Sequence, residues 1–160
     1  MRRSVQIDIP ENTHSLSWTK DAFSLNYSIF GNGQIVGKIS DKSIDRSAKA
    51  SLYGEKFIFE TEGFIKTYIN IFHINSKTEI GRIEFELIRS RAKINLNGEY
   101  YFWKFSNLLN TKWILHNKNQ KTLISGEKRK EGSFRNQPEA NPILLLCALI
   151  IRNWYIKHGN

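Results

Sequence analysis

The chain has 160 residues and a formal net charge of +9, and 40% of its residues are hydrophobic, including 10 Phe, 6 Tyr and 4 Trp. This length favours a single domain over residues 1–160, and the aromatic content excludes a largely disordered chain. One cysteine, Cys147, excludes an intramolecular disulfide and favours a reducing, cytoplasmic location. The excess of basic residues indicates a surface that attracts polyanions such as phospholipid headgroups or nucleic acid.

The N-terminal stretch MRRSVQIDIPENTH has two arginines but no apolar run behind them, so we expect no secretory signal. A short strand is predicted at Val5–Ile9. In FSLNYSIF (Phe23–Phe30), apolar and polar residues alternate, which is typical of a half-buried strand. The following GNG supplies the positive-φ positions of a tight hairpin, and Gln34–Ser40 returns as its second strand.

Further hairpins follow, separated by turn signals, and no stretch before Pro142 shows a helical period. Strands over residues 1–137 therefore number about ten to twelve. The predicted pairs are Ala48–Tyr53 with Lys56–Glu60, Ile65–Ile74 with Thr78–Leu87, Ala92–Leu96 with Tyr100–Phe105, and Lys112–His116 with Lys121–Gly126.

An internal repeat relates two of these blocks. AKASLYGEKFIFE, from Ala48, and AKINLNGEYYFWK, from Ala92, align without a gap at an offset of 44 residues. We infer a duplicated four-strand unit, with YSIFGNGQIVGKIS as a partial third copy of its second hairpin. The alignment predicts that Leu52 is equivalent to Leu96 and Ile80 to Ile124, and that Phe59 and Trp103 both point inward.

The C-terminal stretch is a different kind of element. Every residue from Ile143 to Ile151 is apolar. The run is too short for a membrane span, which needs about 20 apolar residues. Asn141 as N-cap and Pro142 in the first turn predict a helix over residues 142–158. Because a helix without a polar face must be covered on all sides, we expect a closed antiparallel barrel with this helix through its centre.

Four segments carry a family resemblance: Tyr27–Ser40, Ile69–Ile83, Trp113–Gly126 and Asn141–Ile151. Repeated strands of the type x-I-F-x-N-G-x-x-V/I-G-K/R-I and a final helix that opens N-P-x-L-L-L-x-A-L resemble the tubby C-terminal-like superfamily. That group includes the tubby domain, phospholipid scramblases and the LURP-one-related proteins. The resemblance implies a twelve-stranded barrel around a hydrophobic helix and phosphoinositide binding at a basic surface. The acidic calcium segment and cysteine-rich stretch of scramblases are not evident, so scramblase activity is not implied.

The sequence offers little for catalysis, and we predict a non-enzymatic protein without cofactor or metal. Cys147 lies within the apolar run, where a thiol is inert. Glu84 and Glu86 share a strand face and are explained by surface charge. The histidines lack partners at metal-ligand spacing, and we expect them to be structural: His14, His73, His116 and His158.

Two basic clusters are the candidate binding residues: Arg89, Arg91 and Lys93 in the first, and Lys128, Arg129, Lys130 and Arg135 in the second. They favour a module that engages anionic phospholipid or phosphoinositide headgroups, peripherally at the inner membrane face. One alternative is a protein-interaction or accessory domain whose charge is incidental. A third is nucleic-acid binding, because EYYFWKF mixes Lys104 with the outward-facing Tyr100 and Phe102.

Overall fold

The structure, a computed structural model, describes residues 15–42, 46–86, 89–127, 131–136 and 141–158. Within these ranges, strands precede a single helix, α1 (Ile143–Lys157). The strands are β1 (Ser15–Lys20), β2 (Tyr27–Gly31), β3 (Gln34–Asp41), β4 (Ser47–Leu52), β5 (Glu55–Glu62), β6 (Tyr68–His73), β7 (Thr78–Glu86), β8 (Arg91–Leu96), β9 (Glu99–Phe105), β10 (Lys112–Asn117), β11 (Thr122–Glu127) and β12 (Glu131–Asn136).

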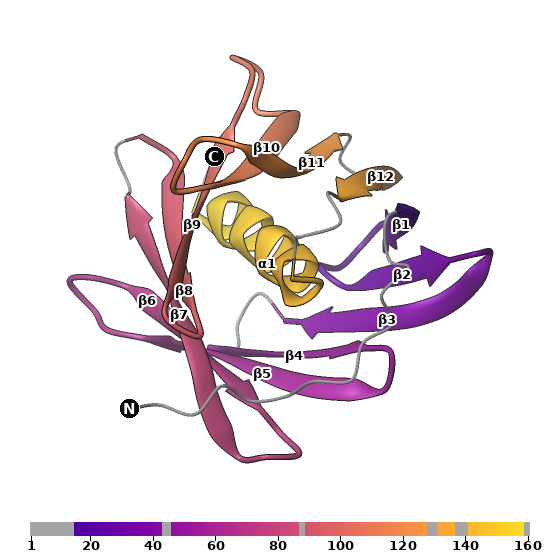
Figure 1. The fold of residues 1–160 in the computed structure, drawn as a ribbon, viewed down its shortest axis with the longest axis horizontal. Helices are drawn as coiled ribbons and strands as arrows, with labels where there is room; N and C mark the ends of the chain where they lie inside the picture. The colour runs from indigo at the N-terminus through magenta and orange to yellow at the C-terminus, as the bar shows by residue number, and fades with distance from the viewer. Residues whose placement is uncertain (1–14, 43–45, 87–88, 128–130, 137–140, 159–160) are drawn as a thin grey trace.

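All the strands belong to one antiparallel sheet in which each pairs with its neighbour in the chain. β1 pairs with β12 as well as with β2, so the order of hydrogen-bonded neighbours returns to its start. Pairing between β11 and β12 is the shortest, with two residue pairs. Figure 1 shows the strands arranged around α1. The prediction of a mainly β chain with one C-terminal helix is confirmed.

Helix α1 begins at Ile143, one residue after the predicted start, with Pro142 and not Asn141 in the N-cap position. Pro142 already has helical φ and ψ of −59° and −24°, and the Asn141 side chain accepts a hydrogen bond from the Ile143 amide at 3.0 Å. Every residue from Ile143 to Tyr155 is buried. Within the described residues, no helix has the length and apolar character needed to cross a bilayer.

The repeat is visible in the strand pairing. Leu52 and Leu96 are the last residues of the equivalent strands β4 and β8, as predicted. Phe59 and Trp103 are both buried, also as predicted. The second hairpins instead differ by one residue. In each hairpin the register shifts at a β-bulge, after Ile71 in the first and after Leu115 in the second. The bulged residue without a partner on the opposite strand is Ile80 in the first hairpin and Leu123 in the second. Ile80 therefore corresponds to Leu123 and not to Ile124, because the turn of the later copy is one residue shorter.

Two indole rings pack over glycines on the neighbouring strand. Trp113 pairs with Gly126, and Trp18 pairs with Gly132. A Cβ added at Gly126 would lie 2.1 Å from Trp113, and one at Gly132 would lie 2.8 Å from Trp18. Because real Cβ contacts are never that short, only glycine fits opposite these rings.

Several strand limits differ from the prediction. β2 begins at Tyr27, and Phe23 lies in a loop that the bond from the Asp21 amide to the Asn26 carbonyl closes at 3.0 Å. β6 begins at Tyr68, which leaves Ile65 in a loop. The structure also has two strands that are not among the predicted pairs, β1 and β12. The predicted strand Val5–Ile9 lies outside the described residues.

The last turns of α1 carry a buried polar cluster. Asn153 accepts a hydrogen bond from Tyr27 Oη at 2.7 Å and donates to Asp41 Oδ2 at 2.9 Å. Lys157 Nζ lies 2.6 Å from Asp41 Oδ1. Arg152, also buried, places its guanidinium over the Trp18 ring at 5.4 Å. Burial raises the pKa of Tyr27 to about 12, against the opposing effect of the Arg152 charge, so this phenol stays a neutral donor.

We expect Leu145→Asp to abolish folding. Leu145 is fully buried, and an unpaired charge there costs several kcal/mol, which is a large share of the stability of a small domain. Leu108→Asp is the matched control, because Leu108 is fully exposed. The measurements are soluble yield and thermal unfolding. A chain ending at Glu139 that still unfolded cooperatively would contradict the central role of α1.

Cys147 provides a second test. It is fully buried, and desolvation raises the pKa of its thiol far above the usual value. We expect a thiol reagent to modify it only when the protein unfolds, since the thiolate is the reactive form. At saturating reagent the modification rate should therefore level off at the unfolding rate seen by circular dichroism. Modification of the native protein as fast as that of the denatured chain would contradict the burial.

Candidate functional site

The structure describes all of the first predicted basic cluster but only Arg135 of the second. Arg91 and Lys93 are exposed on the outer face of β8, and Arg89 is exposed in the turn before it. Arg135 lies in β12, which is four strands from β8 in the sheet order. The remaining candidates fall outside the described residues: Lys128, Arg129 and Lys130. The structure therefore describes the surroundings of the first cluster.

Arg91 and Lys93 line a cavity of about 400 Å³ along β7, β8 and β9, with lining residues from both faces of these strands. We call this the β7–β9 cavity. Lys66, from the loop after β5, and Lys104, from β9, complete its basic residues. The rest of the lining is acidic, aromatic or small: Glu84, Phe85, Glu86, Ala92, Phe102, Trp103 and His116.

Strand register explains why these side chains meet. Arg91 is opposite Glu86 on one side and Lys104 on the other. Lys93 is likewise opposite Glu84 and Phe102. Residues directly opposite on neighbouring strands share a face with Cβ atoms about 5 Å apart. These two rows form the outward-facing part of the cavity, and the row between them, Phe85, Ala92 and Trp103, lies on the inward-facing side of the same strands.

The charges in this cavity are only partly compensated. Lys93 Nζ lies 3.4 Å from Glu84 Oε2, with both side chains more than one third exposed. Within the described residues, no ion pair holds Lys66, Arg91 or Lys104. Four basic residues against two carboxylates leave the cavity with a positive charge that an anion could neutralise.

Two aromatic residues on β9 lie beside the same basic groups. Lys93 Nζ lies 5.3 Å from the centre of the Tyr100 ring. The Phe102 ring stacks on the His116 ring at a centroid distance of 5.4 Å. Tyr100 and Phe102 therefore belong to the outer face, as their alternation with Trp103 predicts, and each already has a neighbour on the protein.

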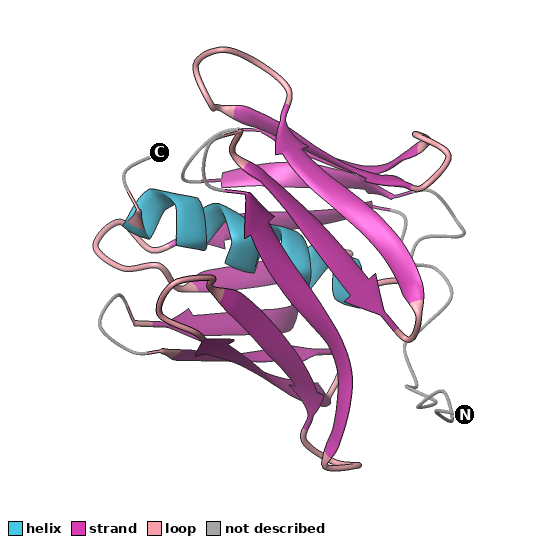
Figure 2. Cartoon of the chain, turned by 90° about the vertical axis from the view of Figure 1, so that its left-hand side faces the viewer, coloured by secondary structure: helices cyan, strands magenta, loops and turns pink. Residues whose placement is uncertain are grey.

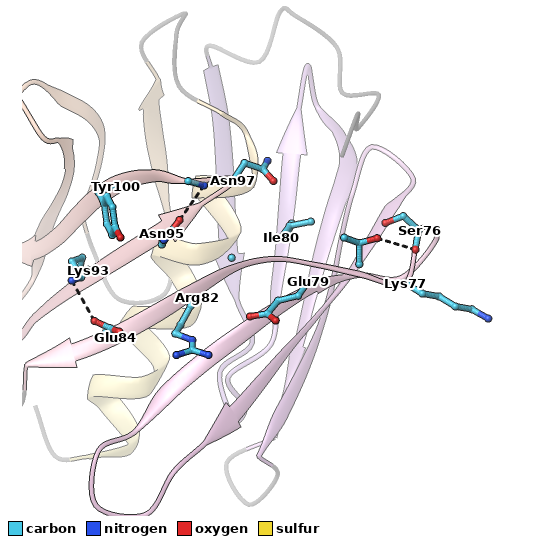
Figure 3. A pocket seen from close by; sticks show the side chains of 13 residues that line it. Ser76, Lys77, Glu79, Ile80, Arg82, Glu84, Lys93, Asn95, Asn97 and Tyr100 are labelled. Atoms are coloured by element: carbon cyan, nitrogen blue, oxygen red, sulfur yellow. Dashed lines mark hydrogen bonds and ion pairs between the residues drawn. The ribbon is translucent and has the colours of Figure 1, made fainter. Parts of the chain in front are cut away.

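A larger hollow of about 1170 Å³ adjoins the cavity along the β6–β7 and β8–β9 hairpins. Figure 3 shows Arg82 and Glu84 from one hairpin, and Lys93 and Tyr100 from the other. Lys93 and Glu84 line both spaces. The hollow is less basic than the β7–β9 cavity, because Glu79 and Glu84 stand against Lys77, Arg82 and Lys93.

His73 has a partner on each ring nitrogen. Its Nε2 lies 2.6 Å from Glu55 Oε2, and its Nδ1 lies 2.8 Å from Ser76 Oγ. The imidazole is buried against Phe57, whereas Ser76 is exposed in the turn after β6 and lines the larger hollow. These bonds tie the β6–β7 turn to the start of β5, in agreement with the structural role expected for His73. Within the described residues, no group of His, Cys, Asp or Glu could hold a metal ion.

Comparison with known proteins supports the fold. No family model and no curated protein matches the chain. The crystal structure of a protein from Arabidopsis thaliana is similar, with a TM-score of 0.63 at 8% sequence identity, over 89% of this chain and 92% of that chain. At this level of identity the similarity shows a shared fold alone.

Sequence reasoning missed half of the basic residues in the cavity. Lys104 could have been found, because the Asn97–Gly98 turn sets the hairpin register that places it opposite Arg91. Lys66 had no such signal, since it lies in a loop whose path depends on tertiary contacts.

Proposed function

We propose that this chain is a non-enzymatic binding module that engages anionic phospholipid headgroups, including phosphoinositides, at the β7–β9 cavity. In this proposal the sheet is a closed barrel of the tubby C-terminal-like type around α1. The module acts peripherally at the cytoplasmic face of a membrane, without a cofactor.

The observation that carries the proposal is the convergence of four basic residues from three elements on one cavity: Lys66, Arg91, Lys93 and Lys104. Lysine and arginine are the usual partners of phosphate oxygens. A volume of about 400 Å³ is within the range of small-ligand sites. The carboxylates Glu84 and Glu86 suit the hydroxyl groups of a headgroup, which donate hydrogen bonds.

The two remaining alternatives make different demands on this surface. A nucleic-acid strand needs several stacking faces along a basic track, whereas Phe102 is already stacked on His116. A protein-interaction domain with incidental charge needs no compact basic site at all. The proposal is therefore tested by asking whether binding depends on the cavity or on total charge.

We expect Arg91→Gln/Lys104→Gln to weaken binding to vesicles that contain phosphatidylserine or a phosphoinositide by about 30-fold. Each basic residue near an anionic leaflet contributes about 1 kcal/mol, so losing two costs about 2 kcal/mol. Co-sedimentation with vesicles at two salt concentrations measures this, and the parent should bind less at the higher one.

The matched control is Lys49→Gln/Lys56→Gln, on the outer faces of β4 and β5. This variant also loses two positive charges, but at positions outside the cavity, and it should retain most of the vesicle binding. Equal losses in both variants would indicate diffuse attraction by net charge. If the parent binds neither vesicles nor nucleic acid at low salt, the headgroup proposal is wrong and the protein-interaction alternative stands.

Serine hydrolase activity is a second candidate, because Ser76, His73 and Glu55 have the connectivity of a nucleophile, a base and an orienting carboxylate. In such a reaction Ser76 Oγ would attack an acyl carbonyl and pass its proton to His73 Nδ1. The proton would then move to the leaving group, and water would release the acyl group. We favour the structural role, since the three residues connect a hairpin turn to its neighbouring strand.

A fluorophosphonate probe distinguishes these roles, because it labels activated serines. We expect no labelling of the native protein above that of Ser76→Ala. Stoichiometric labelling that Ser76→Ala and His73→Gln both abolish, with the fold retained by circular dichroism, would establish the hydrolase instead.

A further inference from the structure

Five large apolar side chains are more than three-quarters exposed, and they occur on three loops. Phe23 is 103% exposed in the β1–β2 loop, and Phe64 and Ile65 are 95% and 100% exposed in the β5–β6 loop. Leu108 and Leu109 are 100% and 77% exposed in the β9–β10 loop. Scattered exposure of single apolar residues is normal, but full exposure of paired residues at loop tips needs an explanation.

The three loops lie at the same end of the sheet. Neighbouring strands are antiparallel, so every second connection falls at the same end. The last turns of α1 also reach this end. Asn153 Nδ2 donates to the Leu25 carbonyl in the β1–β2 loop, and Tyr155 Oη donates to the Glu86 carbonyl at the end of β7. In Figure 2 this is the left-hand end, where helix α1 ends.

The opposite end is built differently. Its connections include tight turns with small or polar residues in left-handed conformations, as at Asn32–Gly33 and Asn97–Gly98. The apolar side chain most exposed near that end is Ile35, at 54%. The two ends of the same sheet therefore differ in loop length and in apolar exposure.

Specific hydrogen bonds hold the apolar loops in shape. Asn107 Oδ1 accepts from the amides of Thr111 and Lys112, each at 3.0 Å, and so closes the β9–β10 loop that carries the two leucines. Arg46 Nη2 donates to the Gly63 carbonyl at 3.0 Å, beside Phe64. Loops stabilised in this way present their apolar side chains outward as part of the fold.

Basic residues accompany each of the three loops. Lys20 precedes the loop of Phe23, Lys66 follows Ile65, and Lys112 follows the loop of the two leucines. Arg46 places its guanidinium 5.2 Å from the centre of the Phe64 ring. Asp21 and Glu62 also occur at this end, within a surface that is basic on balance. Apolar side chains among basic ones complement a bilayer whose headgroups are anionic and whose interior is hydrocarbon.

We propose that this end of the protein is a membrane-docking surface, and that the β1–β2, β5–β6 and β9–β10 loops insert their apolar tips into an anionic leaflet. The inference rests on the proposed function and adds the orientation of the bound protein. The C-terminal end of α1 faces the bilayer, and the tight-turn end faces away. Lys66 lines the β7–β9 cavity and also follows the inserted Phe64 and Ile65, so insertion brings the cavity to headgroup depth.

The test places an environment-sensitive fluorophore on a cysteine at either end. Cys147 is fully buried, so labelling of Leu108→Cys or Ile35→Cys under native conditions is confined to the new site. With vesicles of phosphatidylcholine and phosphatidylserine, we expect a blue shift and a rise in emission for the Leu108→Cys label and no change for the Ile35→Cys label. Phosphatidylcholine vesicles should change neither.

Substitution supplies an independent measurement. Phe64→Ser/Leu108→Ser removes apolar surface that makes no contact with the core, so folding should be unaffected and vesicle binding should fall at least about tenfold. Unlike loss of charge, this loss should persist at high salt, because burial of apolar surface is not screened.

The outcomes separate this inference from the proposed function. If the parent sediments with anionic vesicles while the Leu108→Cys label stays unchanged, the docking surface is wrong and headgroup binding stands. If the parent does not bind vesicles, both are wrong. A blue shift that appears without vesicles and grows with protein concentration would assign the loops to self-association and overturn the inference.

Discussion

Burial of α1 is the constraint on which the other features depend. Every side chain from Ile143 to Tyr155 is buried, so the helix offers no face to solvent and must be covered on all sides. One sheet does this by curving until β1 meets β12, which also pairs the strand edges that would otherwise be exposed. Inward-facing positions then fill the space between sheet and helix. Small residues such as Ala48 and Ala92 occupy some of these positions, and indoles that need an opposing glycine, as at Trp113 and Gly126, occupy others.

A helix that is apolar all round has no side that prefers one rotation over another, and packing alone tolerates some sliding along its axis. The polar cluster at its end removes this freedom. Asn153 bonds to Tyr27 and Asp41, and Asp41 also holds Lys157, so these groups are satisfied at one rotation and one depth. Buried ionic groups add little net stability when compared with apolar replacements, but leaving one unpaired costs several kcal/mol. The cluster therefore specifies position more than it stabilises the fold.

Most of the fold could be predicted because its signals are local. Alternating apolar residues and Asn-Gly turns are each read within a short window, and together with the 44-residue repeat they identified the hairpins from β2 to β11. The β1–β12 pair joins distant parts of the chain and has no such signal. Alternation also failed at Phe23, where the same pattern continues into a loop that Asp21 and Asn26 close. For the site, Arg91 and Lys93 could be named from the sequence, whereas Lys66 depends on a loop path that only tertiary structure defines.

The buried helix and the surface site are physically connected through Tyr155. Its hydroxyl donates to the backbone carbonyls of Glu86 and Arg91, at the ends of the two strands that carry most of the charged residues of the β7–β9 cavity. Burial raises the pKa of this phenol, so it remains a donor across the physiological range. Its ring packs on Trp103, which also lines the cavity. The helix therefore holds the strand ends that position Arg91. A shift of α1 within the sheet would alter the spacing of the basic residues in the cavity. The buried helix thus sets the geometry of the surface that we propose binds the headgroup.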